Sequence, residues 1–375
     1  MVTTRRYERP GRVVVKVGSS SLRAPDGGLD AALVAELVAQ VAKLGTEGVQ
    51  VVLVSSGAVA AGLGALGLPT RPGDLPSLQA VASVGQGRLV HTYQARFGDH
   101  GVACGQVLLT ASDVVDRTRY LNARNTFERL LGLGAVPLVN ENDTVVTEEL
   151  RFGDNDRLAA LVASMLGAGL LLLLSDVDGL YDGVPSADPR PPLVERVDDV
   201  AALDDRHIGQ AGSHVGSGGM VTKLEAARIA TFSAAHAVIA NARAPQVVPR
   251  VVDGEALGTW FPPSRRRPDS RKLWIAFAQQ PRGCLVVDAG AVRALTSRGS
   301  SLLAAGVLDA TGDFARGDAV EVVGPDQRIV ARGLVGYDRT ELGRLLGRST
   351  RELVAELGPS YDREVIHRDS LVVVA

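Results

Sequence analysis

Six short polar segments of this sequence carry residues that could bind a phosphate group or a small amino acid. Each one follows a run of apolar residues or precedes a helical pattern. In chain order they are KVGSSS (16–21), SSGA (55–58), NEND (140–143), GDND (153–156), SDVDGLY (175–181) and GSGGMVTK (216–223). Lysines, glycines and small hydroxyl residues suit phosphate oxygens, whereas carboxylate and amide groups suit an ammonium group or a metal ion.

Two of these segments combine a lysine with glycine. Lys16, followed by Gly18 and serines, could place an ammonium and backbone N–H groups against phosphate oxygens. A solvated lysine at a strand end explains the same residues. At 216–223, glycines lead through Thr222 to Lys223 where a helical pattern begins, and such a loop at a helix N-terminus makes a phosphate cradle. A mobile surface loop is the alternative there, and it explains the gathering of Gly, Thr and Lys less well.

The remaining segments are rich in carboxylate, amide or hydroxyl groups. The side chains at 140–143 could grip an ammonium and a carboxylate together, although an Asx-rich turn has the same composition. Asn155 or Asp156 fits a helix N-cap, which explains one polar residue of 153–156 but not three. That cluster could orient lysines or hold Mg²⁺ through water. The glycine of SSGA could let the backbone approach a ligand closely, although a turn with an N-capping serine explains that segment equally well, and 175–181 could line a nucleotide pocket.

Several other patterns argue against competing functions. GLGALG (62–67) matches G-x-G-x-x-G, but it lies several residues after the preceding apolar run, and glycines at a loose helix end explain it. The segment 216–223 lacks the Gly-Lys-[Ser/Thr] order of a Walker A loop, and SSGA lacks the first glycine of a nucleophile elbow. Cys104 and Cys284 are far apart and the six histidines lack ligand spacing, so we expect neither a disulfide framework nor a zinc site.

The elements that would position these segments alternate between strand and helix. Apolar runs at 13–15, 49–54, 102–109, 135–139, 170–174 and 237–240 are continuous, as strands buried on both faces must be. Between 30 and 43 the apolar residues recur at helical spacing, with Asp30 suited to the N-cap and Gly45 to the stop. This repetition predicts an α/β fold, a three-layer αβα sandwich with a mainly parallel sheet, whose ligands bind at the carboxyl ends of the strands.

The texture of the chain changes near residue 258. FPPSRRRPDS (261–270) is rich in proline and like charge, which is typical of a linker. Beyond it, short strand-like runs at 285–287, 319–323, 329–335 and 371–374 alternate with turns. We therefore expect a first domain at 1–258, a linker at 259–280 and a small β-rich domain at 281–375.

The composition is that of an ordinary globular protein, with 46% hydrophobic and 22% charged residues. A formal charge of −2 gives no basis for a whole-chain affinity for nucleic acid or membranes. The segment 1–10 lacks the apolar stretch of a secretory signal, and apolar runs such as 170–174 are far too short to span a bilayer. We interpret the chain as cytoplasmic, with no membrane partner.

Taken together and in this order, the six segments resemble the amino acid kinase superfamily. They are most similar to its members that phosphorylate the side-chain carboxylate of glutamate, the first step of proline biosynthesis. The resemblance covers 11 to about 258, and from RGSSLL (298–303) onward the chain resembles the PUA domain appended to many bacterial members. It implies the amino acid kinase fold for the first domain and a PUA-like fold for the last.

The resemblance also implies roles for individual residues. Lys16 and Lys223 would touch the transferring phosphoryl group, and Asp156 would hold both lysines, with support from Asp154. The residues implied to bind glutamate are Ser56, Asp143 and Asn155. Those implied to bind ATP are Lys16, Ser175, Asp176, Ser217, Gly218, Gly219, Met220, Val221, Thr222 and Lys223. Ser175 stands where threonine is common in relatives, and its hydroxyl would keep the hydrogen bond to phosphate.

Cofactors and partners follow from the same resemblance. It implies ATP with Mg²⁺, no residue dedicated to a metal, feedback inhibition by proline and a homo-oligomer, either a dimer or a tetramer. Within the same fold, the phosphoryl acceptor could instead be acetylglutamate, aspartate, carbamate or UMP. A catalytically silent sensor of proline is a further interpretation, against which the presence of Lys16, Asp156 and Lys223 argues.

An RNA-binding protein is an interpretation from a different class. PUA-like domains occur in RNA-modifying enzymes, and the basic residues at 265–267, with Arg271 and Lys272, could contact phosphates of RNA. A solvated linker explains these charges as well, and the last domain shows no evident aromatic platform on which bases could stack.

Overall fold

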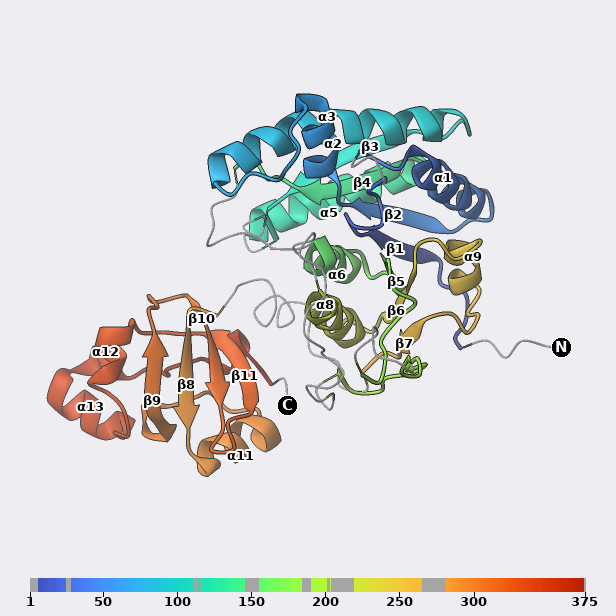
Figure 1. Cartoon of the computed structure of the whole chain (residues 1–375). Helices are drawn as coiled ribbons and strands as arrows, with labels where there is room; N and C mark the ends of the chain where they lie inside the picture. The colour runs from blue at the N-terminus through green and yellow to red at the C-terminus, as the bar shows by residue number, and fades with distance from the viewer. Residues whose placement is uncertain are drawn as a thin grey trace. The chain divides into compact units, whose positions relative to one another are not determined.

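The structure, a computed structural model, divides the chain into two compact units, Met1–Arg267 and Pro268–Ala375. It describes residues 6–24, 28–110, 113–114, 117–145, 155–183, 190–200, 203, 219–264 and 281–373. Each unit has its own sheet and its own hydrophobic core (Figure 1). No helix in this described part of the chain is both long and apolar enough to cross a membrane.

A seven-stranded sheet forms the middle of the first unit, in the order β3-β4-β2-β1-β5-β6-β7. Its strands are β1 (Arg12–Val17), β2 (Gln50–Ser55), β3 (Cys104–Leu109), β4 (Val136–Glu141), β5 (Leu170–Ser175), β6 (His236–Asn241) and β7 (Thr259–Phe261). Neighbours are parallel, except that β7 runs antiparallel to β6. The carboxyl ends of β1 to β6 therefore meet at one edge of the sheet, which we call the carboxyl edge. The three residues of β7 fall in the predicted linker, but their pairing places them in this sheet.

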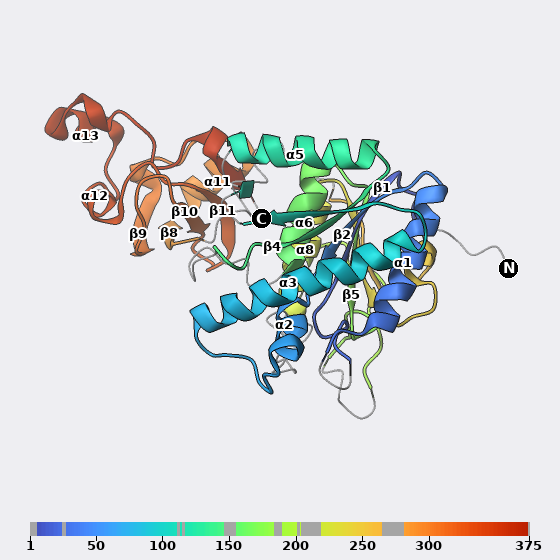
Figure 2. The same ribbon diagram turned by 90° about the horizontal axis from the view of Figure 1, so that it is seen from above.

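Helices cover both faces of this sheet (Figures 1 and 2). They are α1 (Ala31–Thr46), α2 (Ala58–Leu66), α3 (Leu75–Gly98), α5 (Arg117–Gly132), α6 (Asn155–Leu166), α8 (Met220–Phe232) and α9 (Val247–Val252). α1, α3 and α9 lie on one face, and α5, α6 and α8 lie on the other. The predicted αβα sandwich with a mainly parallel sheet is confirmed. Asp30 caps α1 as expected, because its Oδ1 accepts the backbone N–H of Leu33 at 3.0 Å.

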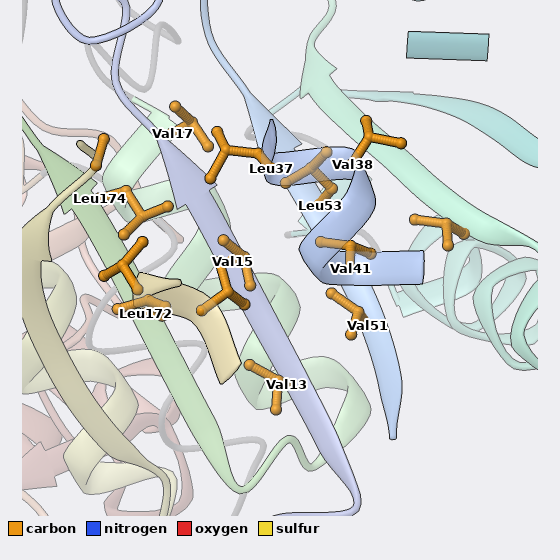
Figure 3. Packing of buried hydrophobic residues seen from close by; sticks show 14 of the residues in the cluster. Val13, Val15, Val17, Leu37, Val38, Val41, Val51, Leu53, Leu172 and Leu174 are labelled. Carbon is orange, nitrogen blue, oxygen red and sulfur yellow. The ribbon is translucent and has the colours of Figure 1, made fainter. Parts of the chain in front are cut away.

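The two faces of the central strand β1 bury different side chains. Its odd-numbered valines share one hydrophobic cluster with α1 and α9: Val13, Val15 and Val17 (Figure 3). Because side chains alternate along a strand, Val14 and Lys16 face the opposite layer, which contains α6 and α8. A lysine therefore enters the interior on the side where the first turns of these two helices lie.

The second unit is built on a five-stranded sheet in the order β12-β11-β10-β8-β9. Its strands are β8 (Gly283–Val287), β9 (Val307–Gly312), β10 (Ala319–Val323), β11 (Ile329–Leu334) and β12 (Leu371–Val373). β8 and β10 are parallel, and the other neighbours are antiparallel. The predicted β-rich domain is confirmed, but the unit also contains helices that the sequence pattern did not predict: α11 (Ala289–Arg298), α12 (Arg339–Gly343), α13 (Thr350–Leu357), η3 (Ala304–Gly306), η4 (Pro359–Tyr361) and η5 (Arg368–Ser370).

Candidate active site

Lys16, Asp156 and Lys223 come from three different elements and meet beside the carboxyl edge of the first sheet. Lys16 lies on β1, Asp156 in the first turn of α6 and Lys223 in the first turn of α8. The Lys16 ammonium pairs with Asp156 Oδ1, and Lys223 Nζ lies 3.1 Å from Asp156 Oδ2. These three residues, which we call the lysine–aspartate cluster, are 2%, 0% and 7% exposed, so water cannot solvate their charges freely.

The cluster combines two ammonium groups with one carboxylate, which leaves a net positive charge of one. Thr222 Oγ1 lies 3.0 Å from Asp156 Oδ2 and 2.9 Å from the carbonyl oxygen of Gly219, so its hydroxyl can donate to either. A carboxylate that pairs with both lysines holds their ammonium groups in fixed positions. Preorganised positive charge in a site that excludes water suits an anionic group such as a phosphoryl group.

A second set of polar side chains lies at the ends of β2 and β4. Asn155 Nδ2 donates to Ser56 Oγ at 2.9 Å and to Asn140 Oδ1 at 2.7 Å. Asn140 Nδ2 in turn donates to Gln86 Oε1, from α3, at 2.7 Å. We call these four residues the amide network. Because Asn155 precedes Asp156 in α6, the amide network and the lysine–aspartate cluster are neighbours at the carboxyl edge.

The loop after β5 forms a third part of the same edge. Ser175 Oγ donates to Asp176 Oδ1 at 3.1 Å. Asp178 accepts from the hydroxyl of Tyr181 at 2.7 Å and from Asn241 Nδ2, at the end of β6, at 2.9 Å. The hydrogen bond from Tyr181 lowers the pKa of Asp178 most, and the one from Asn241 lowers it further, so the pKa lies below its usual range. Asp178 therefore fixes the loop as an ionised group, and Asp176 remains exposed beside the end of β5.

For the other predicted site residues the structure gives only their position in the fold. Asp143 is half-buried in a turn that directly follows β4 and makes polar interactions of its own. Gly219 is the N-cap of α8, and Met220 and Val221 begin that helix. Asp154, Ser217 and Gly218 lie outside the described residues, as do the basic residues at 265–267, Arg271 and Lys272.

One interpretation of the second segment, SSGA, needs correction. Ser56 does not cap α2, because the N-cap is Gly57, which has a φ of 114° in the left-handed region and makes no side-chain cap. A glycine adopts this conformation at no steric cost. The hydroxyl of Ser56 instead accepts from Asn155, as described above. The turn after β2 thus frees its serine for the amide network.

A loose helix end, as predicted, does not explain all the glycines of GLGALG. A Cβ on Gly62 would lie 2.0 Å from the carbonyl oxygen of Val81, and a Cβ on Gly85 would lie 1.7 Å from the carbonyl oxygen of Ala58. Both contacts join α2 and α3 backbone to backbone. Close helix packing therefore requires Gly62, and only Gly67 marks the helix end, as a left-handed C-cap.

Comparison with known proteins gives the following matches. The model of the amino acid kinase family matches residues 11–241, and the PUA domain model matches 283–357. A glutamate 5-kinase of Streptomyces coelicolor is 54% identical over 97% of this chain and 96% of its own length. The glutamate 5-kinases of Frankia casuarinae and Salinispora arenicola are 55% and 54% identical, each over 97% of this chain and over 96% and 98% of their own lengths.

Proposed function

This chain belongs to the amino acid kinase family, with glutamate 5-kinases as its full-length relatives, and from that premise we propose that it transfers the γ-phosphoryl group of ATP to the side-chain carboxylate of glutamate. The products are γ-glutamyl phosphate and ADP, and the reaction is the first step of proline biosynthesis. One observation carries the proposal from the structure: Lys16 and Lys223 share the buried carboxylate of Asp156 directly beside the amide network.

The chemistry explains why a lysine pair, and no general base, is needed. The carboxylate of glutamate is already an anionic nucleophile, so no proton has to be removed before it attacks. The barrier comes from repulsion between two anions and from charge that grows on the leaving oxygen. Lys16, from the sheet, and Lys223, from the helix layer, offer ammonium groups to both ends of the migrating phosphoryl group. Asp156 keeps these groups in position before the substrates arrive, which is the form of electrostatic stabilisation that contributes most to catalysis.

The amide network supplies the acceptor side of the proposed reaction. Ser56, Asn155 and Asp143 are the residues we propose to bind glutamate, and the first two already contact each other at 2.9 Å. Because Asn155 and Asp156 are consecutive in α6, a glutamate held by the amide network would present its side-chain carboxylate toward the lysine–aspartate cluster. The first turn of α6 thus carries both a residue proposed to bind glutamate and the carboxylate that holds the two lysines.

ATP would lie along the ends of β5 and the start of α8, on Ser175, Asp176 and the segment 217–223. Mg²⁺ typically takes one or two carboxylates together with substrate phosphates and several waters. Both oxygens of Asp156 already receive lysine ammonium groups, whereas Asp176 is exposed, so we propose Asp176 as a carboxylate that would help to hold the metal. When bound with the nucleotide, Mg²⁺ would neutralise charge on the phosphates.

We also propose that the chain forms a homo-oligomer and is inhibited by proline, as its resemblance to the family implies. Light scattering after size-exclusion chromatography tests the first proposal. A titration of the kinase activity with proline tests the second, with alanine as the control amino acid.

The reaction is tested by trapping its product. Purified protein is incubated with ATP, Mg²⁺, hydroxylamine and one acceptor from a panel of glutamate, aspartate, acetylglutamate and UMP, and ADP release is measured in parallel. We expect the hydroxamate of glutamate, because hydroxylamine captures an acyl phosphate. ADP release that depends on another acceptor, with no hydroxamate from glutamate, would refute the proposed substrate.

The proposed glutamate contacts are tested by kinetics. Asn155→Ala and Asp143→Ala should raise the KM for glutamate more than the KM for ATP, because each removes a contact to one substrate only. An equal or larger effect on the KM for ATP would move the residue to the nucleotide side of the site.

A further inference from the structure

Gln86 lies on α3, a helix that carries none of the six polar segments, yet its side chain ends in the amide network. Its Oε1 accepts from Asn140 Nδ2 at 2.7 Å. The close packing of α2 and α3 explains how it reaches this place. Gly85 brings the backbone of α3 against Ala58, in the first turn of α2, and Gly57 and Ser56 directly precede that turn. Gln86, which follows Gly85, therefore lies at the carboxyl edge of the sheet.

One backbone donor fixes the orientation of all three amide side chains in the amide network. The N–H of Glu141 can only donate, and it donates to Asn140 Oδ1 at 2.9 Å. Asn140 must therefore direct its Nδ2 toward Gln86, and Gln86 must accept this hydrogen bond with its Oε1. Asn155 in turn must direct its Nδ2 toward Asn140 Oδ1. None of these three amides can rotate by half a turn without placing two donors or two acceptors opposite each other.

The result is a hydrogen-bond acceptor of defined position. Both hydrogens of Asn155 Nδ2 are used, one by Asn140 and one by Ser56. Asn155 Oδ1 is buried and has no hydrogen-bond partner among the residues that the structure describes. A buried acceptor without a partner is costly, and a ligand with N–H groups removes that cost. The ammonium group of an amino acid carries three such donors.

We propose that Gln86 is a positioning residue for the amino-acid substrate. It accepts from Asn140 Nδ2 and, together with the N–H of Glu141, holds the orientation of that amide, which keeps Asn155 Oδ1 available to the ammonium group of glutamate. The inference rests on the proposed function, since it concerns the glutamate side of the same site. Gln86 itself does not touch the reacting groups.

Kinetics of Gln86→Met test this role, because methionine has nearly the same shape but no comparable acceptor. We expect the KM for glutamate to rise about tenfold, the scale of one lost hydrogen bond, while the KM for ATP and kcat stay within about twofold. Gln86→Glu keeps an acceptor oxygen and should restore most of the affinity for glutamate. Gln94→Met is the matched control on the same helix, since within the described part of the chain Gln94 bonds only to the carbonyl oxygen of Cys104, away from the amide network.

A double-mutant cycle separates positioning from a general structural effect. If Gln86 acts through Asn140, then Gln86→Met should change the KM for glutamate less than about twofold in the Asn140→Ala background. A tenfold effect that persists in that background would overturn the inference, and so would an equal rise in the KM for ATP. Gln86→Ala gives the same test if the methionine variant does not fold. If the wild-type protein does not phosphorylate glutamate, the proposed function is refuted instead. If the wild type is active and Gln86→Met leaves the KM for glutamate unchanged, only this inference is refuted.

Discussion

Replacing Asp156 with asparagine should destabilise the first unit strongly, because it leaves two ammonium groups in a closed site without their carboxylate. Asp156 is completely buried, and Lys16 and Lys223 are 2% and 7% exposed. Breaking a buried ion pair by removing one partner costs about 3–5 kcal/mol, since the remaining charge is left uncompensated. For a unit of this size that corresponds to a fall in Tm of about 6–20 °C.

Differential scanning calorimetry of the full chain at pH 7.5, without nucleotide, measures this loss. The matched control is Asp198→Asn, which removes a carboxylate from an exposed pair with Arg196 at 2.6 Å, where the side chains are 55% and 69% exposed. Such surface pairs contribute less than about 1 kcal/mol, so the control should unfold close to the wild-type temperature.

A second variant tests whether charge or packing causes the loss. The triple substitution Lys16→Met, Asp156→Leu and Lys223→Met fills the same space without charge, and such replacements are often neutral or stabilising. We expect its Tm to match or exceed that of the wild type, with no kinase activity. The reasoning fails if Asp156→Asn unfolds within about 1 kcal/mol of the wild type, or if the triple variant is as unstable as Asp156→Asn.

Three other predictions follow from single features. Gly85→Ala should destabilise the first unit by about 1–3 kcal/mol, because its Cβ would meet a backbone oxygen at 1.7 Å, whereas Gly87→Ala, with nothing within 4 Å, should be neutral or stabilising in the same calorimetric assay. Lys16→Ala and Lys223→Ala should each lower kcat about 10²–10³-fold, as the loss of one preorganised donor does, and a near wild-type kcat in steady-state assays would remove the catalytic role. Burial lowers the pKa of His236, so the unfolded state binds the proton more readily and stability should fall as pH drops below about 6.5. Urea unfolding from pH 7.5 to 5 should therefore show a smaller pH dependence in His236→Gln.

The first unit could be predicted from the sequence because its signals are local. Strands buried on both faces need continuous apolar runs, and six of these runs correspond to β1 to β6. The helix after Asp30 shows both its periodicity and its cap. β7 is only three residues long and depends on pairing with β6, so no local pattern distinguishes it from a linker.

The amide network was only partly predictable, because its parts are distant in sequence. Asn155 and Asn140 stand out as polar residues next to apolar runs. Gln86 does not, since one polar residue among the many on a long helix carries no signal of its own. Its position depends on Gly85, and the contact of Gly85 with Ala58 exists only once α2 and α3 have packed. Contacts between helix backbones leave no periodic trace in a sequence.

Lys16 shows most directly how function and fold compete at this site. β1 is buried on both faces, and its other interior positions are valines, so the fold alone favours an apolar residue at position 16. The lysine is tolerated because the carboxylate of Asp156 lies opposite it, whereas an apolar trio is expected to fill the same space at no greater cost. On that expectation, folding does not require the three charges. They add a positive site closed to water, which is what a phosphoryl transfer between two anions needs, so the strongest violation of the local burial pattern marks the chemistry.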